Sequence, residues 1–312
     1  MQTWSLVGGR WRTDDAEAAE CRWFALDSQD DDALRVLAER YHLHPLAVED
    51  CLSSLLHAPK VDDFGDYLFI VLQAITVARA GSDTQEFDAF VGPDFLITFV
   101  DDPAPFAEIF DAVMQLLREA RPTRQGADGL FYELADRMVD RALPQVDILA
   151  EELEGLQSTA LEAGNTRQHR EITQVRARAG SLRRLLAAQV SVVLRLSRGE
   201  FRQVTDANRI YYRDIYDHLV RVDLSLETLR EDAEVALSTS LSVLNNQMNE
   251  VMKVLAIVGA LALPATLIAG IFGTNFHDVP WLQSAWGFWA MIAVMVGVAA
   301  GMAGYFWRRG WF

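Results

Sequence analysis

Residues 254–272, with the sequence VLAIVGALALPATLIAGIF, decide the architecture of this chain. They form an uncharged run of 19 residues. At a rise of 1.5 Å per residue the run covers about 29 Å as a helix, close to the roughly 30 Å hydrocarbon core of a bilayer. The run therefore predicts a membrane-spanning helix.

A second uncharged run follows at residues 285–307. Aromatic side chains, which favour the membrane interface, lie around its ends: Trp281, Trp286, Trp289, Tyr305 and Trp307. Two such runs predict a helical membrane hairpin, and buried core helices of a soluble protein are the alternative. Lys253 precedes the hairpin and Arg308 and Arg309 follow it, whereas the connecting loop has no Lys or Arg. We therefore expect a multi-pass protein of the inner (plasma) membrane with cytoplasmic N- and C-termini.

The charge of the chain lies almost entirely before the hairpin. Among 312 residues, 44 Asp and Glu outnumber 28 Lys and Arg, and the net charge is −16. An acidic soluble part repels nucleic acid and attracts cations, so we expect no nucleic-acid partner. The 2 cysteines cannot make a disulfide scaffold. A phosphate-cradling glycine loop and a catalytic Ser/His/Asp order are both missing, so the sequence does not predict an enzyme.

The soluble part divides into an α/β region and a helical region. In residues 1–125 strand-like and helix-like segments alternate, which predicts an α/β cytoplasmic domain with a mixed sheet sandwiched by helices. The expected strands are WSLVG (4–8), RWFALD (22–27), DYLFIVLQAITV (66–77), FDAFVG (87–92) and FLITFV (95–100). Residues 126–250 predict long cytoplasmic helices, because proline is absent from 145–263.

The last of these helices is expected to continue into the membrane. The helical segments are 130–163, 166–198 and 200–272, and the third would be about 110 Å long. No single chain could bury such a helix, so we expect it to pack on helices of other subunits; a solvated or coiled-coil helix is the alternative. The remaining divisions are a pore-lining membrane helix at 251–274, a periplasmic loop at 275–284, a second membrane helix at 285–307 and a basic cytoplasmic tail at 308–312.

One line along this helix is small or mildly polar. A spacing of seven joins Ser238, Asn245, Met252, Gly259, Thr266 and Gly273. Such a line either lets helices approach closely or faces an aqueous axis. Asparagines at both ends, Asn245, Asn246 and Asn249 at one and Asn275 at the other, favour a pore for a hydrated cation. Neutral amides suit Mg²⁺, which dehydrates reluctantly, and Met252 and Leu255 would form an apolar constriction that gates by dewetting.

Several motifs resemble the CorA family of divalent-cation channels, usually described as magnesium transporters. The specific ones are NEVMKVL at 249–255, Pro264, IAGIFGTNF at 268–276 and Pro280. HPLAVED at 44–50, PKV at 59–61, DYLFIVL at 66–72 and YRDIYDH at 212–218 are similar to the family in the same order. The resemblance implies a homopentamer with a funnel-shaped cytoplasmic domain, a long pore helix and an outer membrane helix.

The resemblance also assigns roles to residues of this chain. It implies a gate at Asn249, Met252 and Leu255, pore-lining roles for Leu263 and Thr266, and a selectivity motif of Gly273, Thr274 and Asn275. For regulation it implies that Mg²⁺ is bound by Asp50 facing Asp214 of a neighbouring subunit, with Glu49 and Asp136 as a second pair. Mg²⁺ would thus be both the transported ion and the regulator that holds the channel shut.

The chain also departs from the family pattern. The signature Gly-Met-Asn reads Gly-Thr-Asn because position 274 is Thr, Ser238 replaces an expected acid, and Ala256 replaces an expected Thr. We expect Mg²⁺ transport, with Co²⁺ or Ni²⁺ tolerated. A transporter of zinc or another transition metal with the same fold, and a membrane-anchored sensor or scaffold that conducts nothing, are the alternatives.

Overall fold

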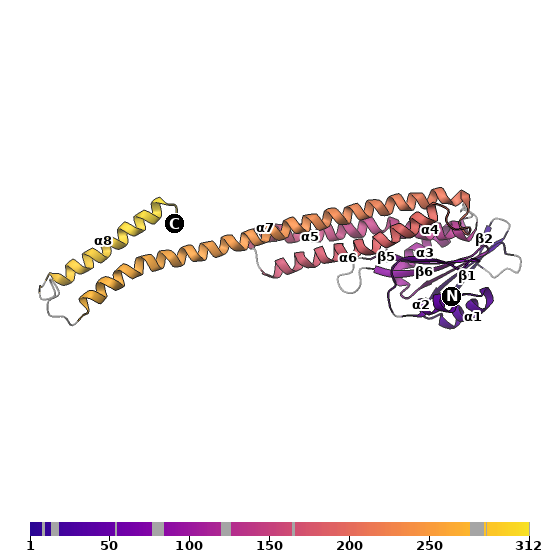
Figure 1. Cartoon of the computed structure of the whole chain (residues 1–312), viewed down its shortest axis with the longest axis horizontal. Helices are drawn as coiled ribbons and strands as arrows, with labels where there is room; N and C mark the ends of the chain where they lie inside the picture. The colour runs from indigo at the N-terminus through magenta and orange to yellow at the C-terminus, as the bar shows by residue number, and fades with distance from the viewer. Residues whose placement is uncertain are drawn as a thin grey trace. The chain divides into compact units, whose positions relative to one another are not determined.

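The computed structural model describes the chain except residues 8–9, 14–18, 54, 77–83, 120–125, 164–165, 275–283, 285 and 312, and the side chains of 159–163 and 166. The fold has two compact units, and each is described by itself. Unit 1 comprises Met1–Glu162 and Thr166–Leu237, and unit 2 comprises Ala163–Asn165 and Ser238–Phe312. Figure 1 traces both along the chain.

Unit 1 contains a seven-stranded sheet, which is mixed, as the sequence predicts. The strands are β1 (Gln2–Val7), β2 (Arg10–Arg12), β3 (Cys21–Asp27), β4 (Lys60–Asp63), β5 (Leu68–Ile75), β6 (Thr84–Val91) and β7 (Phe95–Val100). Their order is β2-β1-β3-β7-β6-β5-β4. β3 and β7 pair in parallel, and the other pairs are antiparallel. The two edge strands, β2 and β4, were not expected from the sequence.

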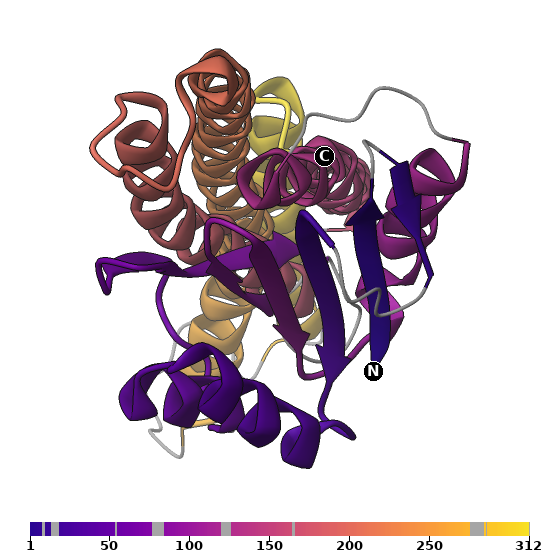
Figure 2. The ribbon, with the colours of Figure 1, turned by 90° about the vertical axis from the view of Figure 1, so that its right-hand side faces the viewer.

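Helices cover both faces of this sheet. Along β5 the side chains alternate, because successive residues of a strand point to opposite faces. Phe69 and Val71 pack in a core with Leu34 of α1 (Asp31–Tyr41) and Cys51 of α2 (Pro45–Leu52). Leu68, Ile70 and Leu72 join the core on the other face, which includes η1 (Ala104–Phe106), α3 (Ala107–Arg118) and α4 (Ala127–Asp140). Figure 2 shows α1 and α2 on one face and the later helices on the other, so the predicted sandwich is confirmed.

The helices that follow are α5 (Ala142–Ala163), α6 (Thr166–Ser197) and α7 (Asp206–Phe272). The helix expected at 130–163 is two helices that meet at Arg141, and the helix expected at 200–272 begins six residues later than expected. Gly199, with a φ of 70°, ends the preceding turn in a conformation that favours glycine. Asp128 then accepts hydrogen bonds from the backbone N–H and hydroxyl of Thr205, both at 2.8 Å, just before α7 begins.

The first part of α7 packs within unit 1. Its buried residues alternate in steps of three and four, a spacing that puts them on one face of a helix. They are Tyr212, Ile215, Leu219, Val222, Leu226, Leu229, Ala233 and Ala236, and all belong to the larger core. This stripe anchors α7 against the other helices of unit 1.

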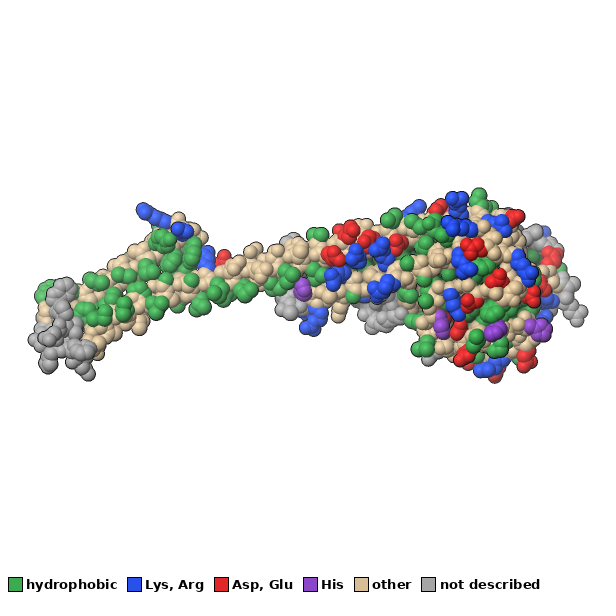
Figure 3. Space-filling view, viewed as in Figure 1, with side chains coloured by type: hydrophobic (Ala, Val, Ile, Leu, Met, Phe, Trp, Pro, Cys, Tyr) green, Lys and Arg blue, Asp and Glu red, His purple; other side chains and the backbone are tan. Residues whose placement is uncertain are grey.

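Unit 2 contains the end of α7 and α8 (Gly287–Arg308). In the described part of the chain, α7 and α8 are the helices long and apolar enough to span a membrane. In each of them, 6% of the most apolar 18-residue stretch is buried within the chain. Figure 3 shows hydrophobic side chains along these two helices and charged side chains over unit 1. Apolar surface of this extent requires lipid or other chains to cover it.

Candidate functional site

The residues expected to form the gate are exposed on α7. Met252 and Leu255 lie three residues apart, so they share one side of the helix. They are 58% and 63% exposed, and Leu263, two turns further along, is 71% exposed. Asn249 is exposed one turn before Met252. Each is free to contact water or another chain, and a ring of such side chains around an axis would be apolar at 252 and 255 and polar at 249.

Three of the residues expected to line the pore share a groove on α7. This shallow groove of about 430 Å³ is lined by Leu263, Thr266 and Thr274, together with Leu267, Gly270 and Ile271. The Thr266 hydroxyl donates to the carbonyl of Ala262 and the Thr274 hydroxyl to the carbonyl of Ile271, each at 2.8 Å. Because each hydroxyl hydrogen is already donated to a backbone carbonyl, each threonine oxygen can act towards a ligand only as an acceptor, through its lone pairs.

The helix ends where the selectivity motif begins. The backbone N–H of Gly273 still donates to the carbonyl of Ala269 at 2.8 Å, and that of Thr274 to Ile271 at 3.3 Å. A Cβ at position 273 would lie 3.1 Å from the Ala269 oxygen, so glycine fits this close approach. Asn275, the third residue of the motif, lies outside the described residues.

The first expected regulatory carboxylates lie on α2. This helix begins at Pro45, which suits a first helical position, and His44 Nδ1 accepts a hydrogen bond from Leu46 N–H at 3.2 Å. Asp50 Oδ2 lies 2.7 Å from Lys60 Nζ, and Asp50 Oδ1 lies 3.6 Å from His57 Nε2. Glu49 is exposed and has no hydrogen bond or ion pair with any described residue. Both carboxylates line a hollow of about 1050 Å³ beside α2.

Asp214 and Asp136 lie on other helices of unit 1. Asp214 is exposed on α7, and among the described residues neither it nor Asp136 bonds to Asp50 or Glu49. The structure of one chain thus does not bring together the pairs that the resemblance implies. This agrees with the expectation that Asp50 faces Asp214 of a neighbouring subunit, and does not test it.

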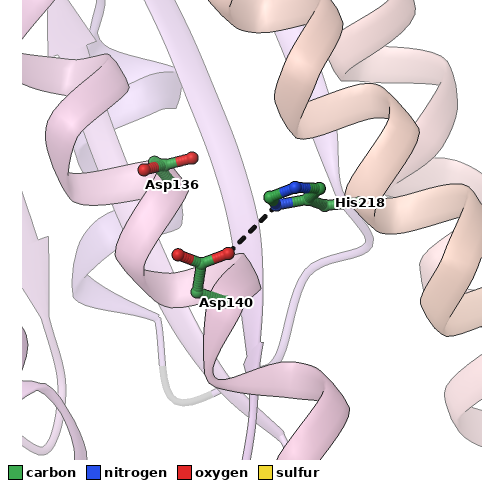
Figure 4. Close-up of side chains that lie close together, drawn as sticks. All are labelled: Asp136, Asp140 and His218. Carbon is green, nitrogen blue, oxygen red and sulfur yellow. Dashed lines mark hydrogen bonds and ion pairs between the residues drawn. The ribbon is translucent and has the colours of Figure 1, made fainter.

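Asp136 instead belongs to a cluster with Asp140 and His218 (Figure 4). One ligand atom from each of the three side chains lies within 4.8 Å of the others. Asp136 and Asp140 are one turn apart on α4, and His218 Nδ1 lies 3.0 Å from Asp140 Oδ1. Burial, and then the charge of Asp140, raise the pKa of Asp136 above its ordinary value. A cation between the two carboxylates would relieve this repulsion.

Asp140 and His218 were missed by the sequence reasoning. The four-residue spacing of Asp136 and Asp140 was a usable signal, because residues i and i+4 are neighbours on a helix face. His218, which is 78 residues from Asp140, carried no such signal. Carboxylates bind Mg²⁺, whereas the imidazole adds a ligand that suits Zn²⁺, Co²⁺ or Ni²⁺.

The chain is similar to known transporters along most of its length. The sequence model of the family described as "CorA-like Mg2+ transporter protein" matches residues 18–309. The cobalt/magnesium transport protein CorA of Thermotoga maritima is 30% identical over 284 residues, which cover 90% of this chain and 80% of that protein. The zinc transport protein ZntB of Pectobacterium carotovorum is 26% identical, covering 93% of this chain and 87% of that protein.

A solved structure shares the fold. The complete structure of the CorA magnesium transporter from Methanocaldococcus jannaschii matches with a TM-score of 0.87 at 20% identity, covering all of this chain and 98% of that chain. Its fold therefore includes both the α/β unit and the two apolar helices. The family match over residues 18–309 and the 30% identity to the Thermotoga maritima protein show that the chain belongs to the CorA-like Mg²⁺ transporter family, which consists of divalent-cation transporters and not of enzymes.

Proposed function

We propose that this chain forms a homopentameric channel that carries Mg²⁺ across the inner membrane, with α7 lining the pore and α8 on the lipid side. The observation that carries the proposal is the uncovered face of α7. The most apolar 18-residue stretch of α7 is 6% buried within the chain. The exposed side chains of this helix nevertheless include Asn249 and Thr266, which carry neutral oxygens. Lipid alone would not favour these polar groups, whereas a hydrated axis between copies would.

The residues along that axis would act at three levels. Asn249 accepts hydrogen bonds from the water shell at the cytoplasmic end, and Met252 and Leu255 close the pore by expelling water when the ring narrows. Leu263 and Thr266 line the membrane segment. The Gly273, Thr274 and Asn275 motif forms the outer mouth, where neutral oxygens bind the ion's water shell without holding the ion too tightly to leave.

Mg²⁺ on the cytoplasmic side would regulate the channel. Bound Mg²⁺ would be shared by two pairs of carboxylates and would hold the closed pentamer together. The first pair is Asp50 of one subunit with Asp214 of the next, and the second is Glu49 with Asp136. One site at ten times its Kd contributes about 1.4 kcal/mol, whereas changing a population from 1:99 to 99:1 takes about 5.5 kcal/mol. About four or more sites must therefore act together, and the equivalent interfaces of a pentamer supply them.

The orientation in the membrane follows from the basic residues. Basic residues near the ends of membrane spans favour the cytoplasmic side. They are Lys253 before the first span and Arg308 and Arg309 after the second, so both termini lie in the cytoplasm. Unit 1 would then meet cytoplasmic Mg²⁺, as feedback regulation requires. The lipid bilayer would cover the exposed apolar side chains of α8.

Transport of zinc or another transition metal is the second candidate. It is favoured by the imidazole of His218 beside Asp136 and Asp140. The likeness to a zinc transport protein fits the same reading. A sensor or scaffold that conducts nothing would need the regulatory residues, but it would have no need of the neutral oxygens along α7.

Ion flux into liposomes tests these candidates directly. We expect Mg²⁺ to enter liposomes that contain the purified protein, with slower entry of Co²⁺ and Ni²⁺ and no dependence on a proton gradient. Asn275→Ala is the matched control, because it should abolish flux while the assembled protein elutes as before. Faster flux of Zn²⁺ than of Mg²⁺ would favour the second candidate, and absence of flux for every ion would contradict transport.

A further inference from the structure

Asp50 is already in contact with two basic side chains of its own chain. Lys60 Nζ lies 2.7 Å from Asp50 Oδ2, and His57 Nε2 lies 3.6 Å from Asp50 Oδ1. Lys60 is the first residue of the edge strand β4, and its register opposite Val71 of β5 sets it beside α2. The neighbouring Glu49 has no such contact with any described residue. Of the two regulatory carboxylates on α2, one is therefore occupied within a single chain.

Lys60 has a second acceptor within reach. Its Nζ lies 3.0 Å from Asp62 Oδ2, two residues along β4, and 5.3 Å from the centre of the Phe69 ring. Burial lowers the pKa of Lys60, but the hydrogen bonds that its ammonium donates to Asp50 and Asp62 outweigh this and raise the pKa above its ordinary value. The ammonium is therefore charged at neutral pH. It can leave Asp50 and remain paired with Asp62.

We propose that Lys60 competes with Mg²⁺ for Asp50 and thereby sets the Mg²⁺ concentration at which the regulatory site fills. The inference rests on the proposed regulatory role of Asp50. Mg²⁺ binds carboxylate oxygens at about 2.0–2.1 Å, and an ammonium on Oδ2 occupies a lone pair that the ion would otherwise bind. The positive charge of Lys60 also repels an approaching divalent ion. Asp62 lowers the cost of displacement because the ammonium keeps a partner after Mg²⁺ arrives.

A purely structural ion pair makes a different prediction. If Lys60 only tied α2 to β4, its removal would lower the melting temperature and would not shift the Mg²⁺ response toward lower concentration. Competition predicts opposite shifts for the two partners of the ammonium. Removing Lys60 frees Asp50, whereas removing the carboxylate of Asp62 leaves the ammonium with Asp50 as its remaining carboxylate partner among the described residues.

The test is a Mg²⁺ titration on the full-length protein. Protection of the cytoplasmic part against protease and inhibition of flux by internal Mg²⁺ are measured for the parent, Lys60→Met, Lys60→Arg, Asp62→Asn and Asp50→Asn. We expect Lys60→Met to lower the half-maximal Mg²⁺ concentration about two- to five-fold, the range expected for losing one partly exposed ion pair. Asp62→Asn should raise it, and Lys60→Arg, which keeps the charge, should stay near the parent.

The outcomes separate this inference from the function on which it rests. An unchanged or raised half-maximal concentration in Lys60→Met, with the response lost in Asp50→Asn, overturns the competition and leaves the regulatory site in place. A full Mg²⁺ response in Asp50→Asn overturns the regulatory role itself. If Lys60→Met does not fold, Asp62→Asn decides: a raised half-maximal concentration supports competition, and an unchanged or lowered one contradicts it.

Discussion

Replacing Leu255 with Asn should hold the channel open when internal Mg²⁺ is high. In the proposed closed state, Leu255 and Met252 from each subunit meet around the axis and expel water. An amide at position 255 would hydrogen-bond to water instead and keep the constriction wet. The expected result is a leak that internal Mg²⁺ no longer suppresses.

The size of the effect follows from the exposed surface of Leu255. Fully burying a leucine side chain stabilises a structure by roughly 1.5–3 kcal/mol. Leu255 is 63% exposed in one chain, so covering that surface contributes roughly 1–2 kcal/mol per subunit, or roughly 5–9 kcal/mol over the five subunits of the proposed pentamer. Changing a population from 99:1 closed to 1:99 takes about 5.5 kcal/mol. Loss of this one ring is therefore sufficient to open most channels.

Mg²⁺ influx into liposomes preloaded with saturating Mg²⁺ measures the leak, with a dye or a Mg²⁺ isotope as reporter. Val254→Asn is the matched control. Val254 is 58% exposed and, at 100° per residue, lies about 130° around the helix from the midpoint between Met252 and Leu255. It should conduct as the parent does. The reasoning is refuted if Leu255→Asn is as tight as the parent, or if Val254→Asn leaks as much as Leu255→Asn.

Three further predictions concern other parts of the chain. Asp50→Asn with Asp214→Asn should weaken Mg²⁺ protection of the soluble part against protease and reduce inhibition by internal Mg²⁺; unchanged titrations would remove the regulatory assignment. Thr274→Met should keep Mg²⁺ flux if Thr274 fills the position of the family's Met, and a changed ion ranking in the same flux assay would contradict that. Burial and the charge of Glu86 raise the pKa of Asp88 well above its ordinary value in the folded protein. The folded state therefore binds more protons than the unfolded state and loses stability as the pH rises. The loss is about 1.4 kcal/mol per pH unit between the unfolded-state pKa and the folded-state pKa of Asp88. Asp88→Asn should therefore flatten the fall in melting temperature as the pH rises above the ordinary pKa of an aspartate, and a slope like the parent's would show that Asp88 is not its source.

The sequence predicted the central strands and missed the edges of the sheet. β5 is buried on both faces, so its continuous apolar run was readable, and the structure places it at Leu68–Ile75. β2 and β4 are short, and each has one buried residue, Trp11 and Val61. Their pairing depends on register with a neighbouring strand, which local composition does not encode. Pro144 was a usable signal for the break between α4 and α5 at Arg141, because it lies in the first turn of α5, where proline is tolerated, and would not fit the interior of one continuous helix.

The candidate site was predictable where it follows one helix and not where it joins distant segments. The line through Met252, Leu255 and Thr266 needs only helical periodicity, and the structure leaves all three exposed on α7. The contact of Asp140 with His218 joins residues 78 positions apart, and depends on how α7 packs within unit 1. The family resemblance assigned a role to Asp136, but it assigned none to Asp140 or to His218, the last residue of the motif at 212–218.

The oxygens along α7 bear on which ion the chain carries. The hydroxyl hydrogens of Thr266 and Thr274 are bound to backbone carbonyls, so each oxygen can accept a hydrogen bond from a cation's water shell. The hydrogens of that shell point outward, so a pore for a hydrated ion needs acceptors of this kind. Thr274 therefore adds acceptors where a Met sulfur would offer a weak one. Residues 249–274 contain no His or Cys, the ligands that would strip and hold Zn²⁺. The chemistry of this segment thus favours an ion that keeps its water, and Mg²⁺ is the divalent ion that gives it up most reluctantly.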